Sequence, residues 1–142
     1  MHASILPIEE LRRRLAAEFP ETFNDQSGLI ILKIWHGGCL MRQDFQPSSL
    51  RPGGTISGPA IMALADVSMY IAILASIGWV PLAVTTSLNI NFLKKPAPGA
   101  LAAECRILKL GKRLAVGDVA IQSEEEDGMV AHATSTYSIP PQ

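Results

Sequence analysis

The longest apolar stretch of the chain predicts its central element. Residues 58–77 are small or aliphatic on nearly every side and carry a single charge, that of Asp66. Ser57 is a favourable N-cap, Pro59 suits the first turn of a helix, and Gly78 is typical of a helix end. We therefore predict a helix over about residues 58–77. Because it lacks a polar face, this helix must be enclosed by other structure or by lipid.

Lipid is the weaker of these two alternatives. A transmembrane helix needs roughly 20 apolar residues, and an aspartate near its centre costs about 2.5 kcal/mol or more on insertion scales. No cluster of lysine or arginine flanks the segment to set an orientation. We expect a buried helix in a protein that does not insert into a membrane.

Apolar residues recur at helical spacing near the start of the chain, at Ile8, Leu11, Leu15 and Phe19. This spacing predicts an amphipathic helix over about residues 7–19. Apolar runs bounded by glycine, proline and polar clusters predict strands elsewhere. The expected strands are residues 29–35, 39–45, 84–93, 101–110, 113–123 and 129–139.

The segment 84–93 alternates most regularly between apolar and polar residues. A strand with this pattern buries one face and leaves the other to solvent. We expect one face to carry Val84, Thr86, Leu88, Ile90 and Phe92, and the other to carry Thr85, Ser87, Asn89 and Asn91.

The order of elements is one helix, two strands, the long helix and four strands. The last three strands are joined by short connections, which is typical of an antiparallel meander. An antiparallel sheet curled around the apolar helix would bury most of that helix, and a dimer would cover the rest. We expect an α+β fold with residues 1–142 as a single domain.

Composition and charge exclude several classes of function. The 142 residues carry a formal net charge of −1 with a pI of about 6.3, so we expect no strongly basic surface of the kind that nucleic-acid binding usually requires. A local basic patch is left open by these totals. Cys39 and Cys105 lie far apart without metal-ligand spacing, and we expect buried free thiols. His2, His36 and His132 do not cluster with acids or cysteines, so no metal is expected. The N-terminus lacks an apolar signal-peptide core, which favours a cytoplasmic protein.

The single carboxylate of the central helix is the first candidate for chemistry. Its charged form is costly in apolar surroundings unless hydrogen-bond donors meet it. The alternative to a functional role is that Asp66 lies at a solvent-exposed edge or forms a hydrogen bond with neighbouring backbone. Gly58 and Asp66 are eight residues apart, which is roughly 12 Å along the helix axis. One carbonyl group cannot touch both. If the helix start binds an oxyanion and Asp66 is the base, two antiparallel copies of the helix must face each other. This hypothesis predicts a homodimer, and it leaves open whether two dimers pair into a homotetramer.

Short motifs run through the second half of the chain. In order they are Arg51, Gly54, Ser57-Gly58-Pro59, Asp66, and Asn89-Ile90-Asn91-Phe92 with Pro96. In this pattern the chain from residue 51 to residue 137 resembles the hotdog-fold thioesterases of the phenylacetate-degradation (PaaI-like) type, which cleave acyl-coenzyme A. Their pattern is Asn-x-x-Gly-x-x-His-Gly-Gly, an acidic residue seven positions later, and a strand with Asn-x-x-Phe/Tyr followed by proline. Arg51, Ser57 and Pro59 depart from it.

The resemblance implies roles for three residues in hydrolysis at a thioester carbonyl. The N–H of Gly58, at the positive end of the helix dipole, would stabilise the oxyanion. Asp66 of the opposite subunit would act as general base on water or as direct nucleophile. Thr85 resembles the family's hydroxyl that positions water, and an ordinary strand threonine is the alternative.

The resemblance also implies an acyl-coenzyme A site without a separate cofactor. Cationic side chains at turns could meet coenzyme A phosphates or be plain surface charges. The expected substrate-binding residues are Arg51, Gly54, Ser57, Pro59, Tyr70, Lys94, Lys112 and Arg113.

Three functions remain in competition. The first is hydrolysis of acyl-coenzyme A with aryl or medium-chain acyl groups, and the second is a non-catalytic module that binds acyl thioesters. The third, a hotdog hydratase or dehydratase, is disfavoured because the helix brings no histidine alongside Asp66.

Overall fold

The computed structural model describes residues 2–142, so Met1 of the expected domain lies outside the described residues. The helices are α1 (Ile8–Glu18), the 3-10 turn η1 (Pro47–Ser49) and α2 (Gly58–Ile77). The strands are β1 (Leu29–Trp35), β2 (Gly38–Gln43), β3 (Val84–Phe92), β4 (Leu101–Leu110), β5 (Leu114–Ser123) and β6 (Met129–Ser138). Every predicted helix and strand is present, with ends within two residues of the prediction.

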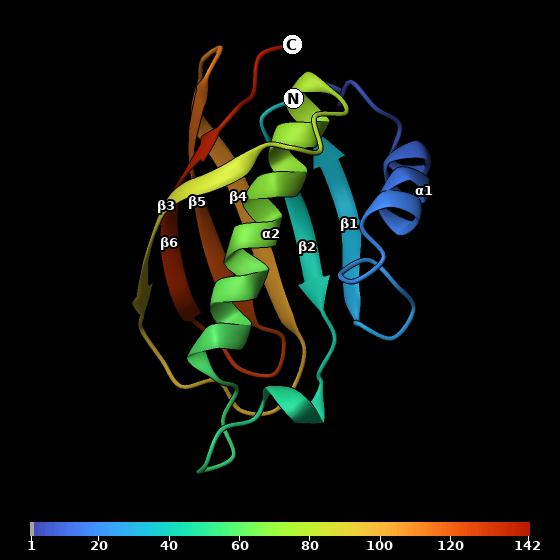
Figure 1. The fold of residues 1–142 in the computed structure, drawn as a ribbon. Helices are drawn as coiled ribbons and strands as arrows, with labels where there is room; N and C mark the ends of the chain where they lie inside the picture. Colours follow the sequence, from blue (N-terminus) through green and yellow to red (C-terminus); the bar gives the residue numbers. More distant parts are fainter. Residues whose placement is uncertain (1) are drawn as a thin grey trace.

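The strands form one antiparallel sheet in the order β1-β2-β4-β5-β6-β3. The sheet curls around α2, which lies along its concave face and contacts all six strands (Figure 1). The predicted meander is β4-β5-β6. β3 precedes β4 in the chain yet pairs with β6 at the far edge of the sheet. The predicted α+β fold, with a long helix wrapped by an antiparallel sheet, is confirmed.

The ends of α2 are set by the residues that the sequence singles out. The Ser57 hydroxyl accepts a hydrogen bond from the N–H of Ala60 at 3.3 Å, and the N–H of Gly78 donates to the Leu74 carbonyl at 3.0 Å. By length and composition α2 could span a membrane, but 67% of its most apolar window is buried inside the fold. Burying one large aliphatic side chain contributes about 1.5–3 kcal/mol, and α2 buries several of them. The helix α2 therefore forms the core of the fold.

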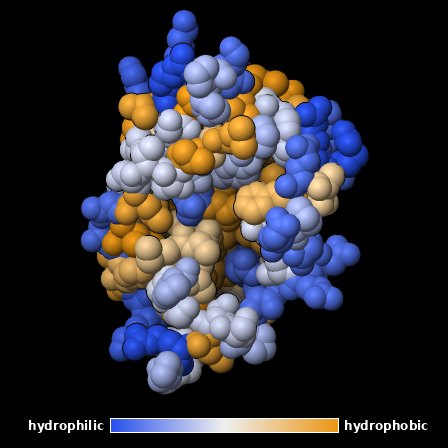
Figure 2. Space-filling view, in the orientation of Figure 1, coloured by the Kyte–Doolittle hydropathy of each residue, from blue (hydrophilic) through white to orange (hydrophobic). Residues whose placement is uncertain are grey.

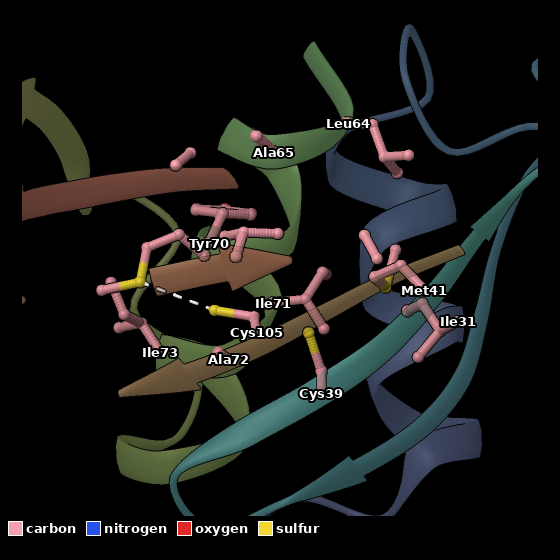
Figure 3. Close-up of a cluster of buried hydrophobic side chains, with 14 of the residues drawn as sticks. Ile31, Cys39, Met41, Leu64, Ala65, Tyr70, Ile71, Ala72, Ile73 and Cys105 are labelled. Carbon is pink, nitrogen blue, oxygen red and sulfur yellow. Dashed lines mark hydrogen bonds between the residues drawn. The ribbon is translucent and has the colours of Figure 1, made fainter. Parts of the chain in front are cut away.

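Cys39 and Cys105 are free thiols buried in this core, as predicted. They are register partners on β2 and β4, and both point toward α2 (Figure 3). The Cys39 thiol donates to the Ser68 carbonyl at 3.1 Å, and the dashed line in Figure 3 marks the 3.8 Å contact between Cys105 and Met69. Burial raises the pKa of Cys39, as does the neighbouring Cys105, which keeps the thiol protonated.

β3 departs from the predicted alternation at its first residues. Thr85 pairs with Tyr137 and Ser87 pairs with Thr136, so Thr86 is left without a partner. Two residues against one define a β-bulge, which reverses the alternation of side chains beyond it. Thr85 therefore faces α2, on the same side as Leu88. The predicted placement of Thr85 on the opposite face from Leu88 is wrong, because strict alternation does not anticipate a bulge.

Candidate functional site

The carboxylate of Asp66 is met by hydroxyl donors from two other elements. Asp66 lies on α2 and is half-buried. Its Oδ1 accepts a hydrogen bond from the Thr85 hydroxyl at 2.5 Å and from the Tyr137 hydroxyl at 3.2 Å. The Tyr137 oxygen also lies 3.1 Å from the Asp66 backbone carbonyl. Within residues 2–142 no hydrogen bond reaches Oδ2, so this oxygen is free to meet a molecule from outside the chain.

The pairing of β3 with β6 brings the two donors together. Thr85 and Tyr137 are direct register partners, and Tyr137 is only 3% exposed. Burial raises the pKa of Tyr137, and the adjacent Asp66 charge raises it further, against the opposing hydrogen bond of Thr85. Tyr137 therefore keeps its proton at neutral pH and acts as a hydrogen-bond donor.

A cavity of about 760 Å³ opens beside Asp66. This volume is in the range of small-molecule sites. The wall combines the end of α1 with parts of α2, β3 and β6, and its aromatic members are Phe19, Tyr70, Trp79 and Tyr137. Phe19 meets Tyr70 edge-on at 6.1 Å between ring centroids, and the Tyr70 hydroxyl donates to the Pro81 carbonyl at 3.0 Å. The cavity is thus a largely apolar, aromatic pocket with two carboxylate residues on its wall, Asp66 from α2 and Glu18 from the end of α1.

A second cavity, of about 600 Å³, lies at the start of α2. Gly58 lines it, and the first N–H groups of a helix have no intrahelical partner. Arg51, Lys94 and Lys95 also line it and give it a positive character. One hydrogen-bond donor of Lys94 is already used, because its ammonium donates to the Asp127 carbonyl at 2.8 Å. This cavity suits an anionic ligand.

The expected catalytic residues therefore occupy two cavities of one protomer. Asp66 and Thr85 line the aromatic cavity, whereas Gly58 lines the cationic one. The eight-residue separation along a straight helix, roughly 12 Å, accounts for this. A single chain does not bring the oxyanion donor and the carboxylate to one point.

The remaining expected binding residues divide between these cavities and other places. Tyr70 lines the aromatic cavity and Arg51 and Lys94 line the cationic one. Neither cavity is lined by the other five. These are Gly54, Ser57, Pro59, Lys112 and Arg113.

Each of these five has another position in the fold. Gly54 is in the turn that closes on the Arg51 carbonyl, Ser57 caps α2, and Pro59 is in its first turn. Lys112 and Arg113 form the exposed turn between β4 and β5. Because Leu114 and Val84 both pair with Ser138, this turn lies beside the start of β3, whereas Lys94 follows its end.

Sequence reasoning missed Tyr137, Phe19 and Trp79 as site residues. Tyr137 is 71 positions from Asp66, and no local pattern links them. The one sequence signal for Tyr137 was its place in the last strand, on the face that alternation turns toward the core.

Among residues 2–142 no group of three or more histidine, cysteine, aspartate or glutamate side chains could hold a metal ion.

Comparison with known proteins gives the class. The family described as the thioesterase superfamily matches residues 53–130, and the chain belongs to that family, whose members share the hotdog fold. The solved structure of a candidate thioesterase from a Silicibacter species is 43% identical, with a TM-score of 0.86 over 97% of this chain and 94% of that chain. The resemblance stated from the motifs is confirmed.

Two further relatives agree with this assignment. A candidate esterase of Saccharolobus solfataricus is 28% identical over 135 residues, which is 95% of this chain and 87% of that protein. The PaaI protein of the E. coli phenylacetic acid degradation operon is 20% identical, with a TM-score of 0.76 over 94% of this chain and 96% of that chain, and it shares the fold.

Proposed function

We propose that this protein hydrolyses acyl-coenzyme A thioesters at a site shared between two subunits of a homodimer. The observation that carries the proposal is the Asp66 carboxylate, held by Thr85 and Tyr137 on the wall of an aromatic cavity. Membership of the thioesterase superfamily supports hydrolysis of a thioester as the reaction. A cytoplasmic location and the pairing of two dimers into a homotetramer stay predictions from the sequence.

The exposed edge of the sheet supports the dimer. β3 is an edge strand, and Val84, Phe92 and Leu93 around it are 49–58% exposed. Unpaired edge strands with apolar side chains are templates for another strand. Figure 2 shows apolar surface on this side of the molecule, beside a hollow.

A twofold axis at this edge would join the two halves of the site. In an isologous dimer with antiparallel β3 strands, the end of one β3 lies beside the start of the other. The nine residues of β3 span roughly 30 Å. Gly58 lies next to the Phe92 ring at the end of β3, and Asp66 lies beside Thr85 at its start. Gly58 would therefore approach the partner's Asp66. The turn with Lys112 and Arg113 would then approach the partner's Lys94.

The chemistry follows from these groups. The thioester carbonyl oxygen accepts a hydrogen bond from the N–H of Gly58, and the positive end of α2 stabilises the developing oxyanion. With Asp66 as general base, a water proton passes to its carboxylate while the water oxygen bonds to the carbonyl carbon. The C–S bond then breaks, the coenzyme A sulfur takes the proton, and a carboxylic acid is released. With Asp66 as nucleophile, the same oxyanion site serves an acyl-enzyme that water cleaves.

The two cavities suit the two ends of the substrate. Arg51, Lys94 and Lys95 would bind coenzyme A phosphates. The aromatic cavity would take the acyl group, and its size and rings favour aryl or medium-chain groups over acetyl.

The test is thiol release from a panel of acyl- and aryl-coenzyme A thioesters. We expect turnover by the wild type and a loss of at least about 100-fold in Asp66→Asn, the usual scale of a general base. Asp25→Asn is the matched control, because Asp25 is exposed and lines neither cavity. Circular dichroism and sedimentation check that each variant is folded and has the same assembly.

The competing function is the acyl-thioester binding module, in which Arg51, Ser57 and Pro59 keep the cavity without turnover. Calorimetry with a non-hydrolysable thioether analogue of the substrate separates the two. A folded dimer that releases no thiol from any thioester, yet binds the analogue equally well in wild type and Asp66→Asn, would replace the enzyme by the binding module.

A further inference from the structure

Asp66 is held at only one of its two carboxylate oxygens. Both hydroxyl donors, from Thr85 and Tyr137, reach Oδ1, at 2.5 Å and 3.2 Å. Thr85 comes from the edge strand β3, Tyr137 from its neighbour β6 and Asp66 from α2, so three elements converge on one atom. Two fixed donors on Oδ1 define the rotation of the carboxylate about its last side-chain bond. Oδ2 receives no hydrogen bond from residues 2–142.

The Tyr137 hydroxyl joins this arrangement to the backbone of α2. It lies 3.1 Å from the Asp66 carbonyl as well as 3.2 Å from Oδ1. The ring is almost fully buried, with 3% of the residue exposed, and it lies 6.4 Å from the Tyr70 ring between centroids. A rigid, buried ring loses little further freedom when its hydroxyl holds a neighbour. Tyr137 is therefore suited to fixing the position of the carboxylate relative to the cavity.

We propose that Tyr137 is a positioning residue for thioester hydrolysis, which together with Thr85 holds Oδ1 of Asp66 and leaves Oδ2 to act on water or on the thioester carbon. The inference rests on the proposed function of the same site. It also gives Thr85 a defined role. Its hydroxyl proton is donated to Asp66, so toward water Thr85 acts as a hydrogen-bond acceptor.

The test compares kcat and KM of Tyr137→Phe with those of the wild type on the best thioester of the panel. The substitution keeps the ring and removes only the hydroxyl. We expect kcat to fall about 10- to 100-fold, the scale of a lost hydrogen bond to a charged group, with KM within about 2-fold. Thr85→Val should lower kcat in the same way and Thr85→Ser should restore it, because serine keeps the donor.

Thr136→Val is the matched control. Thr136 is next to Tyr137 on β6, but adjacent residues of a strand point to opposite faces, and Thr136 lines neither cavity. Removing its hydroxyl should leave kcat and KM unchanged. If the wild type is active and Tyr137→Phe keeps the wild-type kcat, or changes KM alone, the inference is overturned while the proposed function stands.

A spectroscopic measurement tests the inference even without turnover. The 13C signal of the Asp66 carboxyl carbon can be assigned by its loss in Asp66→Asn. We expect it to move in Tyr137→Phe and in Thr85→Val and to stay in place in Thr136→Val. An unmoved signal in Tyr137→Phe would overturn the inference that Tyr137 positions the carboxylate. A wild type that hydrolyses no thioester would overturn the proposed function instead. If Tyr137→Phe does not fold, the Thr85→Val and Thr85→Ser pair tests the joint hold on Oδ1 by the same two readouts, and an unmoved carboxyl signal with wild-type kcat in Thr85→Val would overturn it.

Discussion

The Thr85 hydroxyl lies 2.5 Å from Oδ1 of Asp66, and this contact exists because Thr86 bulges out of the ladder between β3 and β6. The bulge directs Thr85 toward α2, where the Tyr137 hydroxyl reaches the same oxygen. The edge strand β3, which is exposed for another strand, thus also carries Thr85, and its neighbour β6 carries the second donor to the carboxylate, Tyr137. Assembly and catalysis are linked at this edge in the proposed mechanism.

A shared site predicts that two inactive variants restore activity when mixed. Asp66→Asn lacks the carboxylate. In Gly58→Leu a Cβ would already be in van der Waals contact with the Phe92 ring, at 3.4 Å, so we expect the three further carbon atoms of leucine to occupy the cationic cavity beside the oxyanion position. A heterodimer of the two has one intact site and one doubly altered site. After random reassociation of equal amounts we expect about a quarter of wild-type activity per protomer.

The measurement is thiol release after the two variants are unfolded and refolded together. Each variant treated alone is the control and should stay inactive. Absence of recovery, with heterodimers detected by two different tags, would mean that Asp66 and Gly58 do not act in one shared site.

Arg51 is expected to bind the nucleotide end of the substrate. Arg51→Ala should raise KM for coenzyme A thioesters by up to about 5-fold, the scale of an exposed ion pair, and leave kcat unchanged. The effect should shrink as salt is added. For the pantetheine thioester of the same acyl group, which lacks the nucleotide phosphates, KM should not change.

The control for Arg51 is Arg13→Ala, an exposed arginine on α1 that pairs with Glu10 and lines neither cavity. An equal rise in KM for the coenzyme A and pantetheine thioesters would mean that Arg51 contacts a part of the substrate other than the nucleotide phosphates.

Phe19, which caps the C-terminal end of α1, is expected to shape the acyl cavity. Its ring meets Tyr70 edge-on, and Arg14 of α1 stacks over the Trp79 ring at 5.5 Å. Phe19→Ala should lower kcat/KM for aryl thioesters about 10-fold, because the contact between the Phe19 ring and the aryl group is lost. For the acetyl thioester, which has no such ring, kcat/KM should change little. The two substrates measured on one protein provide the control. A uniform loss on both would indicate a general structural effect of the substitution.

The two buried tyrosines predict a loss of stability in alkali. Burial raises the pKa of Tyr70, with a contribution from Glu18, and burial also raises the pKa of Tyr137. Since the folded protein favours the protonated phenol, this stability is fully present below the pKa of about 10 in the unfolded chain. It is lost as pH rises through the folded pKa, by up to about 1.4 kcal/mol per pH unit for each tyrosine.

Urea unfolding from pH 8.5 to 11.5 measures this dependence. Tyr137→Phe removes one of the two groups, so the free energy of unfolding should fall less steeply above pH 10 than in the wild type. Lysines titrate in both proteins and cancel in the difference. Parallel curves would contradict the expected contribution of Tyr137.

Much of the fold could be predicted from the sequence because its signals are local. The helix α2 follows from a long apolar run between Ser57 and Gly78, and both residues make the expected capping bonds. The strands follow from apolar runs between turns, and the position of Asp66 on the core helix follows from counting along the chain. The family resemblance likewise rests on motifs within residues 51–137.

The tertiary structure alone decided what surrounds Asp66. Tyr137 joins it from 71 positions away, and Thr85 joins it through a bulge that strict alternation does not foresee. The register of paired strands depends on the packing of whole faces, and one inserted residue turns a side chain from one face to the other. The sequence by itself determined the elements and the carboxylate, since both depend on neighbouring residues. The donors and the cavities depend on how β3, β6 and α1 meet around α2, and that is a property of the folded chain.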